Sequence, residues 1–247
     1  MESYSIRPLL LSTAEASTSM MTYMLYPDRV SVLPMVAWYI NANGTHILVD
    51  TGISAEEHLK FAKVKMEEIQ SFETALSKVG ISPEDIDILI LTHLHYDHCA
   101  NARKCTNAKV VVQKKELLFA YANHPVFGHY YMKEYFNDLN FWLVDGRREI
   151  HPGIEVIPMT GHTPGCQAVA VETEEGLAVI SGACTIKENF YPPGKLTKVW
   201  PVLIPTFHID IMQSFNDLIY LKGLADILIP QHDLECASKS QIPEPKS

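Results

Sequence analysis

The sequence predicts an α/β fold in which two packed sheets carry helices on their outer faces. Strand-like segments fall into two groups, one ending near residue 113 and the other beginning near residue 155, with helical segments between and after them. Because a sheet or helix must bury its apolar face against another layer, this order favours stacked sheets with outer helices. The 247 residues allow one large domain or two small ones. We assign residues 1–237 to one domain and expect residues 238–247 to form a frayed polar tail.

The first group of strands is predicted over residues 5–11, 35–41 and 45–50. Asn43-Gly44, between the last two, is a strong signal for a tight hairpin turn. Apolar residues at spacings of three and four then predict a long helix over 55–79, which Gly80 ends. A short helix is expected to begin at Pro83, since proline is favoured in a first helical turn.

The apolar run 86–91 predicts a buried strand, and a strand over 109–113 and a helix over 114–122 follow it. The next segment, 123–142, is crowded with aromatic residues. These aromatics either pack a surface helix into the domain or form a lid or wall that gives an apolar substrate its pocket. The pocket interpretation names Phe127, Tyr130, Tyr131 and the more distant Tyr191.

The second group of strands is predicted over residues 155–159, 167–172, 177–181 and 226–230. Glu174-Glu175-Gly176 is expected to form the hairpin turn between the second and third of them. An amphipathic helix is predicted over 209–224, before the last strand.

Composition limits the partners of the chain. The formal net charge is -9 and no tract rich in Lys and Arg is present, so nucleic acid is not an expected partner. No run of about 18 apolar residues occurs, so no membrane span is expected. The five cysteines are odd in number, scattered and in no C-x-x-C pair, which favours reduced thiols and a cytoplasmic location. We therefore expect a small-molecule substrate, and a homodimer is compatible with the sequence.

The most specific motif is Thr92-His93-Leu94-His95-Tyr96-Asp97-His98, which directly follows the buried strand. Three histidines and an aspartate within six residues form a ligand set that zinc prefers. His93 and His95 share one side of an extended segment because side chains alternate along it, whereas Asp97 and His98 come after the chain has turned. Burying four such groups without a metal would be costly. The pattern predicts a site for one metal ion or for two adjacent ions.

Two later histidines also follow predicted strands. His162 lies in Gly161-His162-Thr163-Pro164-Gly165, where glycines and a proline hold the loop tightly. His232 lies in Gln231-His232-Asp233, after the last strand. The fold can bring both loops to the first motif, so they are candidate ligands as well.

These motifs, together with Asp50-Thr51-Gly52, resemble the metallo-β-lactamase fold superfamily. The resemblance covers nearly the whole chain. Within the superfamily it is strongest to the N-acyl-homoserine lactonase group, and the segment Lys187-Glu188-Asn189-Phe190 strengthens this likeness. It implies an αβ/βα sandwich of two packed mixed sheets with the metals at one edge between them.

Carried over residue by residue, the resemblance implies two sets of metal ligands. The first metal would be held by His93, His95 and His162, and the second by Asp97, His98 and His232. Asp50 would orient a ligand histidine by accepting its other ring N–H. The implied cofactor is Zn²⁺, as one or two ions, with iron or manganese as alternatives.

The chain departs from the family at the strand that ends Val179-Ile180-Ser181-Gly182. The family places a bridging aspartate where this sequence has Gly182. The site then holds one metal, holds two bridged only by hydroxide or substrate, or uses another side chain. His208 and Cys184 are the candidates for that side chain, and we favour His208 because it follows a proline-rich loop. If the bridge is simply missing, Gly182→Asp is expected to raise metal occupancy.

The predicted function is that of a metal-dependent hydrolase. A metal lowers the pKa of bound water, so a metal-bound hydroxide can attack a carbonyl, with Asp97 as the catalytic residue that orients the water and shuttles a proton. The expected substrate is a small, fairly apolar lactone or a related cyclic amide or ester. In the lactonase group a tyrosine assists the substrate carbonyl. The equivalent position in this sequence falls near Thr185, and Tyr191 is a candidate substitute for that tyrosine. The alternatives are hydrolysis of a thioester or other ester and, ranked lower, an iron-dependent oxidoreductase of the same fold.

Overall fold

The first half of the chain forms a seven-stranded mixed sheet in the order β4-β1-β2-β3-β5-β6-β7. A computed structural model describes residues 2–122 and 124–245. The strands are β1 (Ile6–Ser17), β2 (Val30–Ala42), β3 (Thr45–Val49), β4 (Met66–Glu68), β5 (Ile88–Ile90), β6 (Lys109–Gln113) and β7 (Phe141–Val144). Strands β4, β1, β2 and β3 pair antiparallel, whereas β3, β5, β6 and β7 run parallel to one another.

The second half forms a five-stranded sheet in the order β12-β11-β10-β9-β8. Its strands are β8 (Arg148–His151), β9 (Ile154–Pro158), β10 (Gln167–Thr173), β11 (Gly176–Ile180) and β12 (Ile227–Ile229). Only the pair β11 and β12 is parallel. Both sheets are therefore mixed, as predicted.

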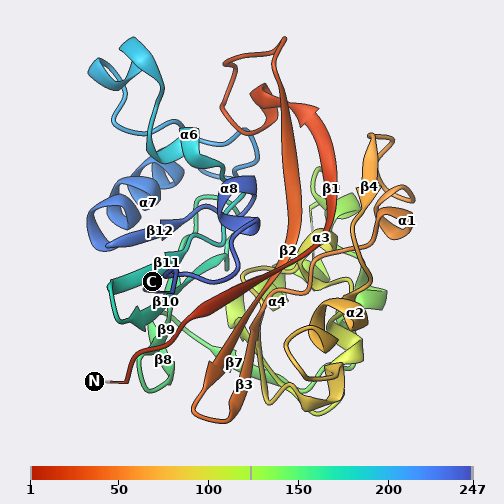
Figure 1. Ribbon diagram of the computed structural model, residues 1–247. Helices are drawn as coiled ribbons and strands as arrows, with labels where there is room; N and C mark the ends of the chain where they lie inside the picture. Colours follow the sequence, from red (N-terminus) through yellow and green to blue (C-terminus); the bar gives the residue numbers. More distant parts are fainter. Residues whose placement is uncertain (1, 123, 246–247) are drawn as a thin grey trace.

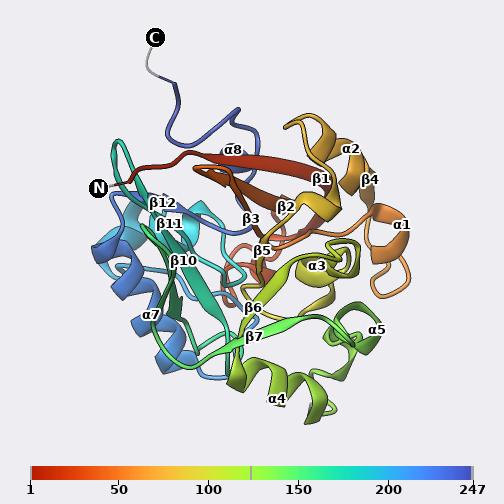
Figure 2. The same ribbon diagram turned by 90° about the horizontal axis from the view of Figure 1, so that it is seen from below.

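Helices cover the outer face of each sheet, as Figures 1 and 2 show. The helices are α1 (Ala55–His58), α2 (Phe72–Ser77), α3 (Tyr96–Cys99), α4 (Lys114–Ala122), α5 (Lys133–Phe136), α6 (Lys187–Phe190), α7 (Ile211–Leu224) and α8 (Leu234–Ala237). In Figure 2, α7 lies outside the five-stranded sheet and α1 to α5 lie beyond the seven-stranded one. None of the helices in the described ranges has the length and hydropathy needed to cross a bilayer.

Three apolar layers hold this sandwich together. Trp38 and Val169 belong to the core between the two sheets. Phe72 and Leu89 belong to the layer between the larger sheet and its helices. Leu218 of α7 packs with residues of β9 to β11 in the third layer. The predicted arrangement of two sheets between helices is confirmed.

The strand ends bring the candidate ligands together. Parallel strands end at the same edge of a sheet, so the loops after β3 and β5 are neighbours, and so are those after β11 and β12. Thr92 lies two residues beyond β5, and its carbonyl accepts the backbone N–H of Gln167 at the start of β10 at 2.9 Å. This bond joins the loops of the two sheets at the edge that carries the histidines.

The predicted long helix over 55–79 is wrong. The segment forms α1, the edge strand β4 and α2. The side chain of Ser54 caps α1, and that of Ser71 caps α2. Met66–Glu68 pairs with β1, whose exposed edge offers free backbone groups to a neighbour. This non-local pairing outweighs the weak helical preference of the segment.

Most of the other predicted elements lie near their observed places, but the strands β7 and β8 were not predicted. The hairpin at Asn43-Gly44 is confirmed, and both residues have positive φ as a tight turn requires. Strands β1 and β2 extend well beyond their predicted ends. The expected tail is not frayed at Ile242, which is buried and exchanges backbone hydrogen bonds with Ile6. Residues 246–247 of that tail, and Asn123 at the start of the aromatic segment, lie outside the described residues.

Candidate metal centre

His93, His95 and His162 converge at the sheet edge. Nε2 of His93 lies 3.1 Å from Nδ1 of His95 and 3.2 Å from Nε2 of His162. All three side chains are buried. A tetrahedral zinc ion with metal–nitrogen distances near 2.0–2.1 Å separates its nitrogen ligands by about 3.3 Å, so these spacings suit such an ion.

Fixed acceptors decide which ring nitrogens carry protons. His162 donates its Nδ1–H to the carbonyl oxygen of Phe207 at 2.7 Å, and a carbonyl can only accept. Thr92 donates its hydroxyl to Asp50 at 2.8 Å, so it accepts from Nδ1 of His93 at 3.1 Å. The lone pairs of the two Nε2 atoms therefore face each other. Such an arrangement is repulsive without a cation and suits a metal ligand set.

These three imidazoles are neutral at pH 7. Burial lowers the pKa of His162 to about 4. Burial, with the neighbouring histidines, also holds the pKa values of His93 and His95 well below the usual range. Neutral imidazole is the form that binds metals.

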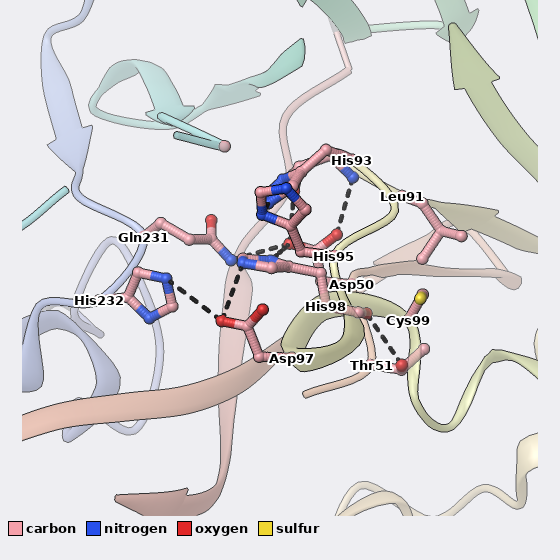
Figure 3. Close-up of polar contacts among 12 residues, drawn as sticks. Asp50, Thr51, Leu91, His93, His95, Asp97, His98, Cys99, Gln231 and His232 are labelled. Carbon is pink, nitrogen blue, oxygen red and sulfur yellow. Dashed lines mark hydrogen bonds and ion pairs between the residues drawn. The ribbon is translucent and has the colours of Figure 1, made fainter. Parts of the chain in front are cut away.

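Asp97, His98 and His232 form a second group beside the first, as Figure 3 shows. Oδ2 of Asp97 lies 3.5 Å from Nε2 of His98 and 4.0 Å from Nε2 of His232. His232 donates its Nδ1–H to the Pro34 carbonyl at 3.1 Å, which leaves its Nε2 lone pair directed toward Asp97. Burial by itself raises the pKa of Asp97, but His98 and His232 outweigh it and lower that pKa to about 2. Asp97 is thus ionised at neutral pH.

Asp50 accepts hydrogen bonds that orient residues of both ligand groups. Its Oδ2 accepts Nδ1–H of His98 at 2.8 Å, the Thr92 hydroxyl at 2.8 Å and an N–H of Gln231 at 2.8 Å. Figure 3 shows Asp50, His98 and Gln231 grouped in this way. Asp50 has the position expected of a residue that orients a ligand histidine. Gln231 was not predicted to take part.

Glu116 is a second organising carboxylate that sequence reasoning missed. It is fully buried on α4. Its Oε1 accepts the Leu94 backbone N–H and the Tyr131 hydroxyl, both at 3.0 Å. Its Oε2 accepts the Thr163 hydroxyl at 2.6 Å and the Gly165 N–H at 3.1 Å. Glu116 therefore ties the loop of His93 and His95 to the loop of His162.

A cavity opens above the two ligand groups. All six candidate ligands line it. Apolar side chains form much of the remaining wall, and they are Ala14, Ala16, Met20, Met21, Leu33, Met35, Phe61, Ala62, Val64 and Phe207. The other lining residues are His58, Tyr96, His129, Tyr130 and Cys184. The site thus combines a polar floor with an apolar wall.

Of the four aromatic residues predicted to line this pocket, the structure places only Tyr130 there. Tyr131 is buried against Glu116, and Phe127 packs on Phe119. Tyr191 is 52% exposed, with Nζ of Lys222 lying 5.2 Å above its ring. The pocket assignment is therefore wrong for Phe127 and Tyr131, because the segment 124–142 folds into short helices that turn most of its rings into the core. It is wrong for Tyr191 because that ring lies at the surface, away from the cavity lining.

His208 does not join the ligand groups. It donates its Nδ1–H to the Pro205 carbonyl at 2.8 Å, and its ring stands edge-on to Tyr23. The proline-rich loop does approach the site, but it does so through the carbonyl of Phe207, which holds His162. Thr185 likewise turns away from the cavity and bonds to Ser181 at 2.7 Å.

Cys184 lines the cavity but stands outside both ligand groups of the described residues. Its Sγ lies 3.7 Å from Sδ of Met21. Burial raises the pKa of its thiol, so the thiolate form that binds metals is disfavoured. No side chain among the described residues replaces the bridging carboxylate in these groups.

Steric contacts with the neighbouring backbone require a glycine at position 182. Its φ is +68°, and a Cβ atom built there would lie 2.0 Å from the backbone oxygen of Gln167. A side chain at this position must displace the backbone of β10, which pairs with β9 and β11. The expectation that Gly182→Asp raises metal occupancy is therefore withdrawn.

We expect Gly182→Ala to lower the free energy of unfolding by about 3 kcal/mol or more, because a backbone clash adds to the cost of a positive φ. Gly182→Asp should do the same without raising metal content. Gly194→Ala is the matched control, since its φ is +59° but its added Cβ meets open space. Thermal unfolding and metal analysis of the three variants test this. Equal stability of Gly182→Ala and Gly194→Ala would contradict the steric explanation.

Comparisons with known proteins agree with this site. A family model described as the metallo-beta-lactamase superfamily matches residues 31–232. An N-acyl homoserine lactonase of Bacillus cereus is 32% identical over an alignment of 180 residues, with a coverage of 67% of this chain and 70% of that protein. An N-acyl homoserine lactonase of Agrobacterium fabrum is 26% identical over an alignment of 193 residues, with a coverage of 68% of this chain and 69% of that protein.

The fold has close structural relatives as well. The crystal structure of a quorum-quenching N-acyl homoserine lactone lactonase matches with a TM-score of 0.79 at 25% identity, covering 99% of this chain and 98% of that one. The likeness spans both sheets, and the family model covers the residues of both ligand groups. The chain therefore belongs to the metallo-beta-lactamase superfamily and is a metal-dependent hydrolase of the lactonase-like kind.

Proposed function

We propose that the protein hydrolyses the ester bond of a small lactone that carries an apolar acyl arm, with N-acyl homoserine lactones as the substrate class. One observation carries the metal part of this proposal. The Nδ1 atoms of His93, His98, His162 and His232 are held by fixed partners, which leaves the Nε2 atom of each as the ring nitrogen available to a metal. The names of the similar lactonases supply the substrate class.

His93, His95 and His162 would hold the first metal ion, and Asp97, His98 and His232 would hold a second. The first group has three neutral ligands, the number that catalytic zinc sites use while keeping a position open. When bound, the metal supplies a water that ionises near neutral pH and a Lewis acid for the carbonyl oxygen. The second group lacks the shared carboxylate at Gly182, so we propose that it binds its ion more weakly.

Asp97 is the proton carrier in this proposal. It is ionised at neutral pH, and its side chain is 20% exposed, more than those of its neighbours His98 and His232. It accepts the proton that the attacking water loses while the bond from water oxygen to carbonyl carbon forms. It returns that proton to the ring oxygen as the carbon–oxygen bond of the lactone breaks. The products are a carboxylic acid and an alcohol on one molecule, and the acid then releases its proton to the solvent at neutral pH.

The apolar wall selects the arm of the substrate. Met20, Leu33, Phe61 and Val64 face the cavity, and they offer no hydrogen bonds to a charged or polar chain. Each buried CH₂ group of an acyl chain would gain about 0.8 kcal/mol there. We therefore propose that substrates with longer acyl arms, up to the length of this wall, bind more tightly.

A substrate panel tests the reaction class. The zinc-loaded protein is given N-hexanoyl homoserine lactone, an open-chain ester and a thioester with the same acyl arm, and ring opening or acid release is followed by mass spectrometry. We expect the highest kcat/KM for the lactone. A thioester or open-chain ester that exceeds the lactone by tenfold would overturn the lactonase assignment while leaving metal-dependent hydrolysis standing.

A further inference from the structure

His58 is a buried polar residue in an otherwise apolar part of the cavity wall. It ends α1, is 6% exposed and lines the same cavity as the ligand groups. Its Nδ1 is buried and has no hydrogen-bond partner among the described residues. Phe61, Ala62 and Val64, which follow it in the chain, line the cavity with it and offer no polar side-chain atom.

The missing partner has an energetic consequence. A buried polar group without a hydrogen bond costs about 1–3 kcal/mol, so the residue would be a net loss to the fold as it stands. Burial lowers the pKa of His58, and the ring is therefore neutral, with one donor and one acceptor nitrogen. The edge-on contact with Tyr96, with ring centroids 5.4 Å apart, does not use these groups. A molecule in the cavity can use them.

The position of His58 indicates which part of a ligand it meets. It does not belong to either ligand group of the described residues, so it is not placed where the lactone carbonyl must react. It lines the same cavity as Asp97, and its ring stands edge-on to Tyr96, the residue directly before Asp97. It therefore stands between the reacting floor and the apolar wall. In an N-acyl lactone, the amide occupies this same place between ring and acyl chain.

We propose that His58 determines specificity by hydrogen bonding to the amide group of an N-acyl lactone. The inference rests on the proposed lactonase function. A neutral imidazole offers a donor and an acceptor, and an amide offers an acceptor and a donor in return. A lactone that carries a plain alkyl chain has no such group and gains nothing from His58.

The test compares two substrates in wild type and His58→Phe. One is N-hexanoyl homoserine lactone, and the other is a γ-lactone with an alkyl chain of similar length and no amide. We expect His58→Phe to lower kcat/KM about tenfold for the amide lactone, mainly through KM, because about one net hydrogen bond is lost. The alkyl lactone should change less than threefold. His58→Asn, which keeps a donor and an acceptor, should recover part of the loss.

Stability gives an independent readout. Replacing an unsatisfied buried nitrogen by a carbon of similar shape should leave the melting temperature of His58→Phe unchanged or raise it. A histidine with a purely structural role would show the opposite. His124→Phe is the control, since His124 is an exposed histidine outside the cavity lining, and it should leave the preference between the two lactones unchanged.

The possible results distinguish a failure of the His58 proposal from a failure of the proposed lactonase function. An equal loss for both lactones, or no loss for either, would overturn the role of His58 while wild-type activity upholds the lactonase. If the wild-type protein opens neither lactone, both proposals fail together. A fall in melting temperature with unchanged substrate preference would assign His58 to the fold alone.

Discussion

His95→Ala is expected to lower lactone hydrolysis by roughly three orders of magnitude, because it removes one of three neutral ligands of the first metal group. Nδ1 of His95 lies 3.1 Å from Nε2 of His93, and its Nε2 is a buried atom without a partner among the described residues. The side chain therefore contributes little to the fold through hydrogen bonds. Metal content should fall while the melting temperature of the metal-free protein changes little.

His129→Ala is the control for this prediction, because His129 lines the same cavity without belonging to either ligand group. Metal analysis of the purified variants and kcat/KM for one lactone are the two measurements. A His95→Ala variant with full metal content and full activity would remove His95 from the ligand set. Equal losses in both variants would assign the effect to the shape of the cavity.

Glu116→Gln is expected to have the second-largest effect. Each carboxylate oxygen of Glu116 accepts one backbone N–H, from Leu94 on one side and from Gly165 on the other. A glutamine has one oxygen, so its NH₂ group must face one of these backbone donors in either orientation. The change should lower the free energy of unfolding by about 3 kcal/mol and misplace one of the two ligand loops.

The kinetic signature of Glu116→Gln follows from its position. Glu116 is not among the residues that line the cavity, and it acts by holding the loops that carry His93, His95 and His162. We expect metal affinity and kcat to fall while KM changes little. Glu188→Gln is the control, because that glutamate forms an ion pair with Arg29 near the surface, where such pairs contribute little. Unchanged metal affinity in Glu116→Gln would contradict the role of Glu116 as a clamp.

The sequence was most informative where the signal is local. The order of His93, His95, Asp97 and His98 after an apolar strand is a compact ligand pattern, and the structure brings these residues together with His162 and His232. Strands with apolar runs bounded by turn residues were likewise found near their observed places. The hairpin at Asn43-Gly44 needs only two residues to specify its turn.

Non-local contacts account for what the sequence did not predict. The residues near Met66 carry no signal that they pair with the edge of β1, so their apolar spacing predicts a helix instead of a strand. Glu116 resembles any glutamate in the first turn of a helix until the fold places Leu94 and Gly165 against it. Its one signal is its position directly after a strand of the sheet that carries the ligands.

Gly182 shows why aligning one residue with a family motif is not enough. The missing carboxylate suggested that a neighbouring side chain takes its place, with His208 favoured. In the structure the glycine has a left-handed conformation and abuts the backbone of Gln167, while His208 bonds to its own loop. A side chain at position 182 would therefore meet this backbone, and among the described residues the second metal group has Asp97 as its one carboxylate.

Ring opening by metal-free and reloaded protein tests the central claim most directly. The protein is stripped with a chelator, dialysed, divided and reloaded with zinc in one portion, and opening of N-hexanoyl homoserine lactone is followed by NMR. We expect no opening above the spontaneous rate without metal and restored opening after zinc is added, with one equivalent restoring most of it. Equal rates in the two portions, or no opening by the reloaded protein, would contradict metal-dependent lactone hydrolysis at this site.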